Sequence, residues 1–111
     1  MSVGVDTVGR VSVNIGVYME ISGLRDDREQ VGMTMLLTEV MREHRMDRDV
    51  FVSMWGKGGD LSVRADSGDH KVIFSGFHRW RPDFEEMLTA RATQLVSHAQ
   101  VYYGWEYEDE F

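Results

Sequence analysis

The sequence predicts an α+β fold, a two-layer sandwich in which two helices cover one face of a mostly antiparallel sheet. Residues 11–21 alternate apolar and polar side chains, which is typical of a strand with one buried face. Two later segments, 27–46 and 82–100, repeat apolar residues at helical spacing. Turn-rich sequence divides the region between them into three short strands. The order is therefore β-α-β-β-β-α-β, for which a ferredoxin-like variant with one extra strand is a candidate.

The first predicted strand follows a segment without clear periodicity. Residues 1–10 mix glycine, valine and aspartate, and we expect a loose arm at the start of a single domain that spans residues 1–111. Within the strand, Gly16 indicates a bulge or a closely approaching neighbour. Gly23 is expected to end the strand.

The first helix has a start signal and an apolar stripe. Asp26 followed by Glu29 resembles a capping box, with Asp26 as the N-cap. The helix is predicted from about Asp27 to Met46. Its apolar stripe recurs at helical spacing and consists of Met33, Leu36, Leu37, Val40, Met41 and His44.

Three short strands are predicted between the helices. Glycine-rich residues 56–60 separate Val50–Trp55 from Leu61–Ala65 and favour a β-hairpin. Residues 66–69 form a second turn before Lys71–Phe77. The middle strand alternates apolar residues with polar ones, so one of its faces is expected to be solvated. The residues of that face are Ser62, Arg64 and Asp66.

The single proline marks the start of the second helix. Pro82 fits the first turn, because its fixed φ suits that position and its missing N–H is not needed there. The carboxylates that follow suit the positive end of the helix dipole. The helix is expected to end near Gln100, and a last strand to begin at Val101. The carboxylates are Asp83, Glu85 and Glu86, and the buried stripe is Phe84, Met87, Leu88, Ala92, Leu95, Val96 and Ala99.

The composition favours a protein-binding role. A net charge of -7 disfavours nucleic acids and anionic membranes, since both attract cationic side chains. No segment reaches the length of a membrane span and no leader peptide is evident, so we expect a cytoplasmic location. The absence of cysteine excludes disulfides and thiolate metal sites. An acidic surface accelerates encounter with a basic partner, and the same charge also fits a general role in solubility.

No catalytic, metal or cofactor site is predicted. The four histidines do not form the i, i+3 or i+4 pair that often begins a zinc site. Nucleophile motifs are absent, and Gly56–Gly59 lacks the spacing of a phosphate-binding loop. The acidic C-terminal residues are poorly placed for the fixed geometry of an acid–base pair. The histidines are His44, His70, His78 and His98.

Two segments carry the residue types of a binding surface. The C-terminal segment combines aromatic rings, which provide rigid contact area, with carboxylates, which attract a cationic partner. Residues 75–81 gather Phe, His, Trp and two Arg where a strand meets a helix. Each segment also fits a structural role, as an acidic last strand and as a core-edge Trp beside solvated Arg. The predicted contact residues are Tyr103, Trp105, Glu106, Tyr107, Glu108, Asp109 and Glu110, with His78, Arg79 and Trp80 as a second group.

The same two segments resemble a known family. Gly76-Phe77-His78-Arg79, a helix, Tyr103-Gly104 and then Glu108-Asp109-Glu110 resemble the core signature of the Imm7-type immunity proteins of bacterial polymorphic toxin systems. In that family an Asn precedes the His-Arg pair, where this chain has Phe. The resemblance covers the last third of the chain. It implies a cytoplasmic protein, not an enzyme, that binds and neutralises a cognate toxin.

Three functional hypotheses follow. The first is an immunity-type protein that inhibits a basic toxin. The second is a phage-encoded acidic inhibitor of a host nuclease, whose carboxylates would imitate phosphates; the Arg residues that interrupt the acids along the chain disfavour it. The third is an enzyme or small-ligand domain in which His78 pairs with carboxylates of the last strand.

Overall fold

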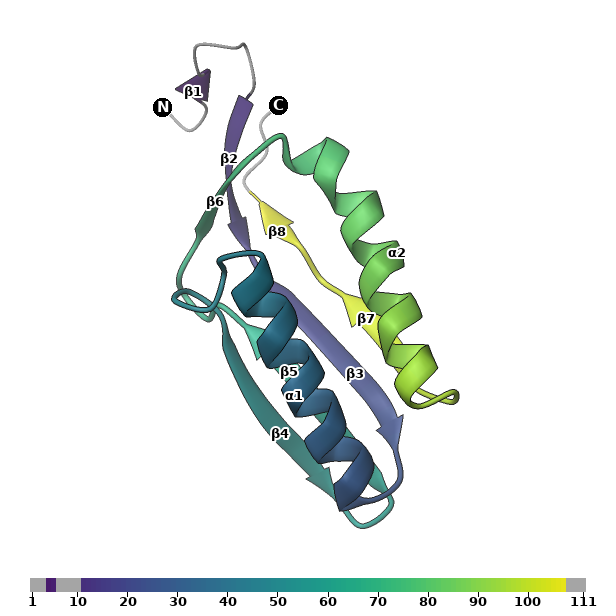
Figure 1. The fold of residues 1–111 in the computed structure, drawn as a ribbon. Coiled ribbons are helices and arrows are strands. Elements are labelled where there is room, and N and C mark those ends of the chain that lie inside the picture. The colour runs from purple at the N-terminus through teal and green to yellow at the C-terminus, as the bar shows by residue number, and fades with distance from the viewer. Residues whose placement is uncertain (1–3, 6–10, 108–111) are drawn as a thin grey trace.

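Two helices and eight strands make up the part of the chain that the computed structural model describes, residues 4–5 and 11–107. Both helices lie on the same side of the sheet layer, so the predicted α+β sandwich is confirmed (Figure 1). The elements are β1 (Gly4–Val5), β2 (Val11–Gly16), β3 (Tyr18–Leu24), α1 (Asp27–Glu43), β4 (Phe51–Lys57), β5 (Asp60–Asp66), β6 (Val72–Ser75), α2 (Phe77–Leu95), β7 (Gln100–Tyr103) and β8 (Glu106–Tyr107).

The described strands form two four-stranded sheets, and the one with the longer strands, which we call the larger sheet, has a ferredoxin-like strand order. Its order is β4-β5-β3-β7, and every neighbouring pair is antiparallel. In chain order these strands are β3, β4, β5 and β7. The first of them, β3, lies between β5 and β7, and the second, β4, lies at an edge, as in the ferredoxin-like arrangement. β6 is the predicted extra strand, and it pairs with β2.

Three strand paths run on from the larger sheet into a smaller one. β2 precedes β3, β6 follows β5 and β8 follows β7, and β2 pairs with both β6 and β8. The predicted strand 11–21 is thus one path that bends at Val17. Residues 4–5 of the predicted arm form β1, which pairs with β2, and the rest of that arm lies outside the described residues.

A buried serine forms the bend. The hydroxyl of Ser67 accepts a hydrogen bond from the Val17 N–H at 2.9 Å, and the Ser67 N–H donates to the Val17 carbonyl at 2.9 Å. The same hydroxyl donates to the carbonyl of His70 at 3.0 Å. Ser67 thereby satisfies backbone groups where the ladder is interrupted. Gly16 has the predicted close neighbour, because a Cβ there would lie 3.3 Å from the Cβ of Glu106.

The first helix begins as predicted and ends earlier. Asp26 caps α1 by accepting a hydrogen bond from the Glu29 N–H at 2.9 Å. The helix ends at Glu43 and not at Met46. Arg45 adopts a left-handed φ of 59°, which redirects the chain after the helix. Met46 is still buried, because this turn folds it back onto the core.

The second helix departs from the predicted start. α2 begins at Phe77, so Pro82 lies inside the helix and not in its first turn. Gly76 precedes the helix with a left-handed φ of 71°. That turn brings the Phe77 ring, 1% exposed, into the core and shortens the predicted strand 71–77. The helix ends at Leu95, before the predicted end. The carboxylates expected in the first turn lie beyond it: Asp83, Glu85 and Glu86.

The glycines predicted to interrupt strands behave in two ways. Gly23 has a φ of 80° and forms a bulge inside β3, which continues to Leu24, so the predicted strand end is wrong. The glycine-rich segment 56–60 closes the predicted β4–β5 hairpin, in which Lys57 pairs with Asp60.

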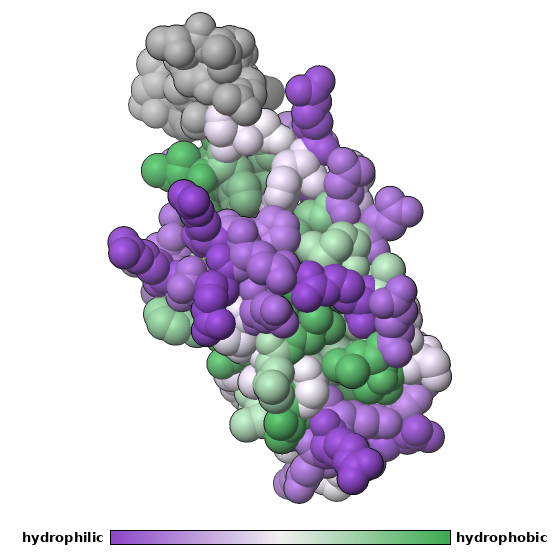
Figure 2. Space-filling view, in the orientation of Figure 1, coloured by the Kyte–Doolittle hydropathy of each residue, from purple (hydrophilic) through white to green (hydrophobic). Residues whose placement is uncertain are grey.

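The core lies between the larger sheet and the two helices. β5 directs its apolar face into it as predicted, and so do most residues of the two predicted helical stripes. Leu95 is an exception, because it is 54% exposed. The outer side of the helices is mainly hydrophilic, with separate small hydrophobic areas (Figure 2). The largest buried side chains include Ile15, Met19, Ile21, Met33, Leu37, Met41, Phe77 and Leu88.

Candidate protein-binding surface

Tyr103, one of the predicted contact residues, links β7 to α2. Its hydroxyl donates to the backbone carbonyl of Glu85 at 2.9 Å and lies 2.8 Å from the hydroxyl of Thr89. Burial raises the pKa of Tyr103 above its ordinary value of 10.0, so the phenol is neutral at physiological pH. This half-buried side chain therefore holds the last strand in place.

Trp105 and Trp80, two further predicted contact residues, belong to an aromatic cluster between α2 and the last strands. The ring centroid of Trp105 lies 5.3 Å from that of Phe77, 5.7 Å from that of Trp80 and 5.9 Å from that of Phe84. Its indole N–H donates to a carboxylate oxygen of Glu85 at 2.5 Å. Trp80 stacks on Phe84 at 4.5 Å. Both tryptophans thus use ring area for packing within the domain.

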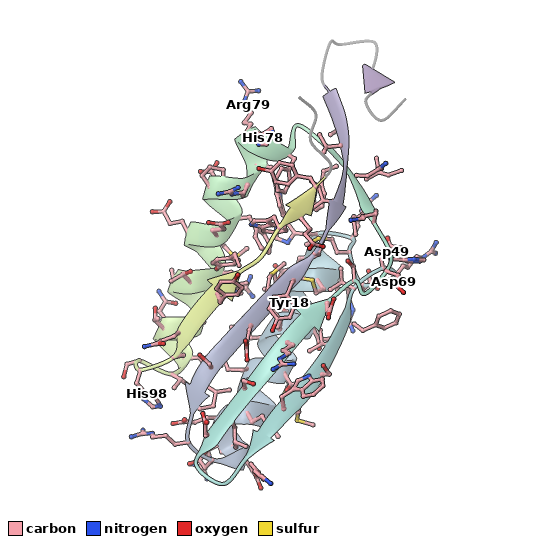
Figure 3. The ribbon with its side chains drawn as sticks, turned by 180° about the vertical axis from the view of Figure 1, so that it is seen from behind. Tyr18, Asp49, Asp69, His78, Arg79 and His98 are labelled. Carbon is pink, nitrogen blue, oxygen red and sulfur yellow. The ribbon has the colours of Figure 1, made fainter. Side chains whose placement is uncertain are left out.

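Four predicted contact residues form an exposed group beside this cluster, which we call the terminal patch: His78, Arg79, Glu106 and Tyr107. The rings of His78 and Tyr107 meet edge to face, with centroids 5.6 Å apart, and Tyr107 is 41% exposed. β8 brings Tyr107 beside the first turn of α2 because it pairs with β2. Figure 3 shows His78 and Arg79 at that end of α2, with Arg79 pointing outward. Outside the described residues lie Glu108, Asp109 and Glu110.

The ring contacts of the terminal patch join His78 and Tyr107 to each other and to Phe77. His78 contacts the rings of Phe77 and Tyr107, and no described carboxylate accepts a hydrogen bond from it. Within residues 4–5 and 11–107, no three His, Asp or Glu side chains converge as metal ligands. None of the described helices is long and apolar enough to cross a membrane. The patch offers a partner two rings, a guanidinium and a carboxylate.

The helix-free face of the larger sheet carries a second aromatic group, absent from the predicted site residues, which we call the open face. Phe51 and Trp55 of β4 are 66% and 47% exposed, and Tyr102 of β7 is 60% exposed. The guanidinium of Arg64 lies 4.2 Å from the Trp55 ring centroid, and its Nε lies 3.5 Å from the carboxylate of Glu20. These contacts place a cation–π pair and an ion pair across the strands.

Strand register contains the signal that identifies the open face. Residues directly opposite each other in neighbouring strands share a face of the sheet. The polar residues of β5 pair with alternate residues of β4, including both of its exposed aromatic residues. The face of β5 that was predicted to be solvated therefore continues across those rings, although Ser62 itself is buried beside Trp55 and so departs from the prediction. The pairs are Asp66 with Phe51, Arg64 with Ser53 and Ser62 with Trp55.

A hollow of about 480 Å³ lies on the helix-free side, at the bend between the sheets. Its lining includes the rings of Tyr18 and Tyr102. Polar groups in the lining have partners: Asp66 accepts from the Gly68 N–H at 2.7 Å, and Ser67 is bonded to the backbone at the bend. The hollow therefore offers ring surface and backbone, without a free acid–base pair among its described side chains.

Comparisons with known proteins give a fold neighbour and no family. No protein-family model and no curated protein matches the chain. Among solved structures, a de novo designed protein, Foldit4, is similar, with a TM-score of 0.57 and 14% sequence identity. The match covers 86% of this chain and 99% of the designed one. At this identity the similarity shows the α+β fold alone, so a functional proposal has to rest on the surfaces described above.

Proposed function

We propose that this protein is an immunity-type inhibitor that binds and neutralises a basic bacterial toxin through the terminal patch. The observation that carries the proposal is the meeting of two distant segments at one end of the molecule. The first turn of α2 supplies His78 and Arg79, and β8 supplies Glu106 and Tyr107. The same two segments carry the resemblance to Imm7-type immunity proteins.

The aromatic cluster supports the terminal patch as a rigid base. Tyr107 contacts the buried ring of Phe77 at 5.8 Å, and Phe77 in turn contacts Trp105 and Trp80. A side chain held by such packing loses little conformational freedom on binding. Tyr107 is therefore the best anchor in the patch, since tyrosine combines a rigid ring with a polar tip.

Charge supports a basic partner. The chain carries 19 Asp and Glu against 12 Lys and Arg, a net charge of -7. Complementary charge accelerates the encounter of two proteins, and salt weakens that effect. Arg79 is a positive charge within the patch of this acidic protein. Its guanidinium would donate to an acceptor on the toxin and help to fix the orientation of binding.

The test is binding to, and inhibition of, a toxin encoded beside this gene. Calorimetry at several salt concentrations should give a dissociation constant that rises with ionic strength. Tyr107→Ala should weaken binding at least 10-fold, as expected for an anchor. Tyr102→Ala is the matched control, because Tyr102 is also an exposed tyrosine but lies on the open face, and it should leave binding unchanged. Full inhibition by the Tyr107→Ala protein would contradict the proposed surface.

A further inference from the structure

β4 is an edge strand with an unusual amount of exposed apolar surface. It ends the strand order of the larger sheet, and Phe51, Met54 and Trp55 are 66%, 56% and 47% exposed. Edge strands are commonly protected by proline, by bulges or by charged side chains. β4 has no proline, its seven residues pair with β5 without a register shift, and its one charge is Lys57 at the end. It therefore has the features of a strand that is covered by another chain.

The hydrogen-bond pattern shows which backbone groups face outward. The Val17 carbonyl accepts from the Ser67 N–H, so the odd-numbered residues of the β5 path point toward β3. Successive residues of an antiparallel ladder point to opposite neighbours. The even-numbered residues of β5 therefore make their backbone hydrogen bonds to β4. Their partners in β4 are odd-numbered residues, such as Ser53 opposite Arg64 and Trp55 opposite Ser62. It follows that Val52 and Met54 direct their N–H and C=O groups to the open edge.

A second observation gives the same orientation. One side-chain nitrogen of Gln30 donates to the carbonyls of both Trp55 and Ser62, at 3.0 and 3.1 Å. A single nitrogen can reach both oxygens because both lie between β4 and β5. Trp55 thus bonds inward, and Met54, its neighbour, bonds outward.

We propose that β4 pairs antiparallel with β4 of a second copy of this chain, with Ser53 opposite Ser53 on the two-fold axis. In this register the outward N–H and C=O groups of Val52 form hydrogen bonds with those of Met54 in the other copy. The Met54 groups of the first copy bond in the same way to Val52 of the second. Four backbone hydrogen bonds then close the edge of both sheets. The two larger sheets become one continuous sheet across the axis.

The side chains match in this register. Phe51 of one copy lies opposite Trp55 of the other, so the open faces join through two cross-strand aromatic pairs. Met54 lies opposite Val52 on the helical side. The same register brings Lys57 of one copy toward the turn that precedes β4 in the other, which carries Asp47 and Asp49, so opposite charges approach each other at both ends of the interface.

The net charge of the chain does not oppose this pairing locally. Each copy carries a charge of -7, but residues 50–59 contain no Asp or Glu. Asp49, which precedes this segment, lies 3.9 Å from the Nε2 of His70 in its own chain and would face the lysine end of the other copy. The terminal patch stays free, because Figure 3 shows His78 and Arg79 far from the end of β4 that follows Asp49. Dimer formation can therefore be tested without the toxin, and its failure would leave the proposed function untouched.

The first experiment is site-directed cross-linking. The chain has no cysteine, so Ser53→Cys introduces a single thiol. A non-hydrogen-bonded antiparallel pair brings two Cα atoms to about 4.5 Å, which is within the range that a disulfide spans, about 4.4–6.8 Å. Mild oxidation by glutathione should convert this variant to a covalent dimer. Ser97→Cys, at an exposed position after α2, is the control and should remain largely monomeric.

The second experiment measures mass in solution. Light scattering should give twice the chain mass of 12.8 kDa for the unaltered protein at 100 μM. Lys57→Asp should weaken the dimer about 5-fold by bringing like charges together at both ends of the interface. Combining it with Asp49→Lys should restore the affinity, which only a charge pair across the interface explains. A monomeric protein at this concentration, or a dimer in which Ser53→Cys fails to cross-link, would overturn the proposal.

Discussion

The two aromatic regions of this molecule differ in what their rings contact. Beside α2, Trp80 and Trp105 pack against other rings at centroid distances of 4.5 to 6 Å. On the open face, Phe51 and Trp55 are 66% and 47% exposed, and Trp55 is covered on one side by the guanidinium of Arg64. The comparison teaches that aromatic content identifies a region of interest, whereas the position of the helix layer decides whether the region is core or surface.

The difference follows from how the helices cover the sheets. α2 packs along β7, so rings of the last strands become enclosed, and their N–H and O–H groups bond to Glu85. The other face of the sheet has no helix above it (Figure 3). Rings there gain contacts only with neighbours in the same sheet. The predictions below compare matched residues from the two regions.

The largest expected effect is that of Trp105→Ala. Removing a packed indole leaves a cavity among Phe77, Trp80 and Phe84 and removes the hydrogen bond to Glu85. We expect the free energy of unfolding to fall by about 3 kcal/mol. Urea denaturation followed by far-UV circular dichroism measures it.

Trp55→Ala is the matched variant from the open face. Its ring contributes one cation–π contact and a hydrogen bond to Ser53, so the loss should be below about 1 kcal/mol at low micromolar concentration. Equal losses for the two tryptophans would mean that the distinction between packed and exposed rings is wrong.

The hairpin that ends β4 allows a second comparison. Gly56 has a φ of 91°, and a Cβ there would lie closer to the carbonyl of Asp60 than any van der Waals contact permits. Gly58 has a φ of 67° with no atom within 4 Å of its Cβ position. Gly56→Ala should therefore cost about 2–3 kcal/mol of stability, and Gly58→Ala about 1 kcal/mol. Thermal unfolding of both variants checks the order, and a reversed order would contradict the described hairpin.

The two adjacent tyrosines of β7 test the same contrast on a smaller scale. Tyr103→Phe removes a hydroxyl that bonds to Glu85 and Thr89, and should cost about 1 kcal/mol. Tyr102→Phe, on the open face, should have almost no effect.

The stabilising contribution of Tyr103 should also depend on pH. Burial raises the pKa of Tyr103 above 10.0, so its stabilising contribution is complete below pH 10 and is lost as the pH rises through the folded-state pKa. The Tyr103→Phe variant should unfold less steeply in alkaline solution than the unaltered protein. When the pH is raised and phenolate absorbance is followed, the variant should have one fewer tyrosine that ionises above the ordinary pKa than the unaltered protein.

The order of elements could be predicted from the sequence because it depends on local patterns. The alternation of residues 11–21 and the Asp26 cap act within a few residues, and both are found in the structure. The start of α2 could not be predicted in this way. The core accepts the Phe77 ring, and Gly76 provides the turn it requires, so burial outweighs the preference of Pro82 for a first turn.

The candidate surface was only partly predictable for a related reason. The residue types near the C-terminus predicted Tyr107 and Trp105 equally as contact residues. Only the packing of α2 separates them, because it encloses Trp105 and leaves Tyr107 exposed. Phe51 and Trp55 required the register of β4 against β5, which depends on pairing between strands and not on the sequence of one strand.

The smallest expected effect concerns a contact between the two halves of the molecule. Glu29, in the first turn of α1, accepts from the Arg25 N–H at 2.8 Å and lies 3.1 Å from the ring of His98, which follows α2. The bond from the Arg25 backbone is the main cause that lowers the pKa of Glu29 below its ordinary value of 4.5.

Glu29 therefore stabilises the protein only while it is ionised. Because its folded-state pKa is the lower one, its contribution is present above pH 4.5 and is lost as the pH falls through the folded-state pKa. Glu29→Gln should lower the melting temperature slightly at pH 7 and reduce its fall on acidification, as calorimetry from pH 7 to pH 3 would show. Glu86→Gln, at an exposed position of α2, is the control that removes one carboxylate away from the start of α1. An unchanged fall in melting temperature for Glu29→Gln would mean that the ionised Glu29 does not stabilise the start of α1.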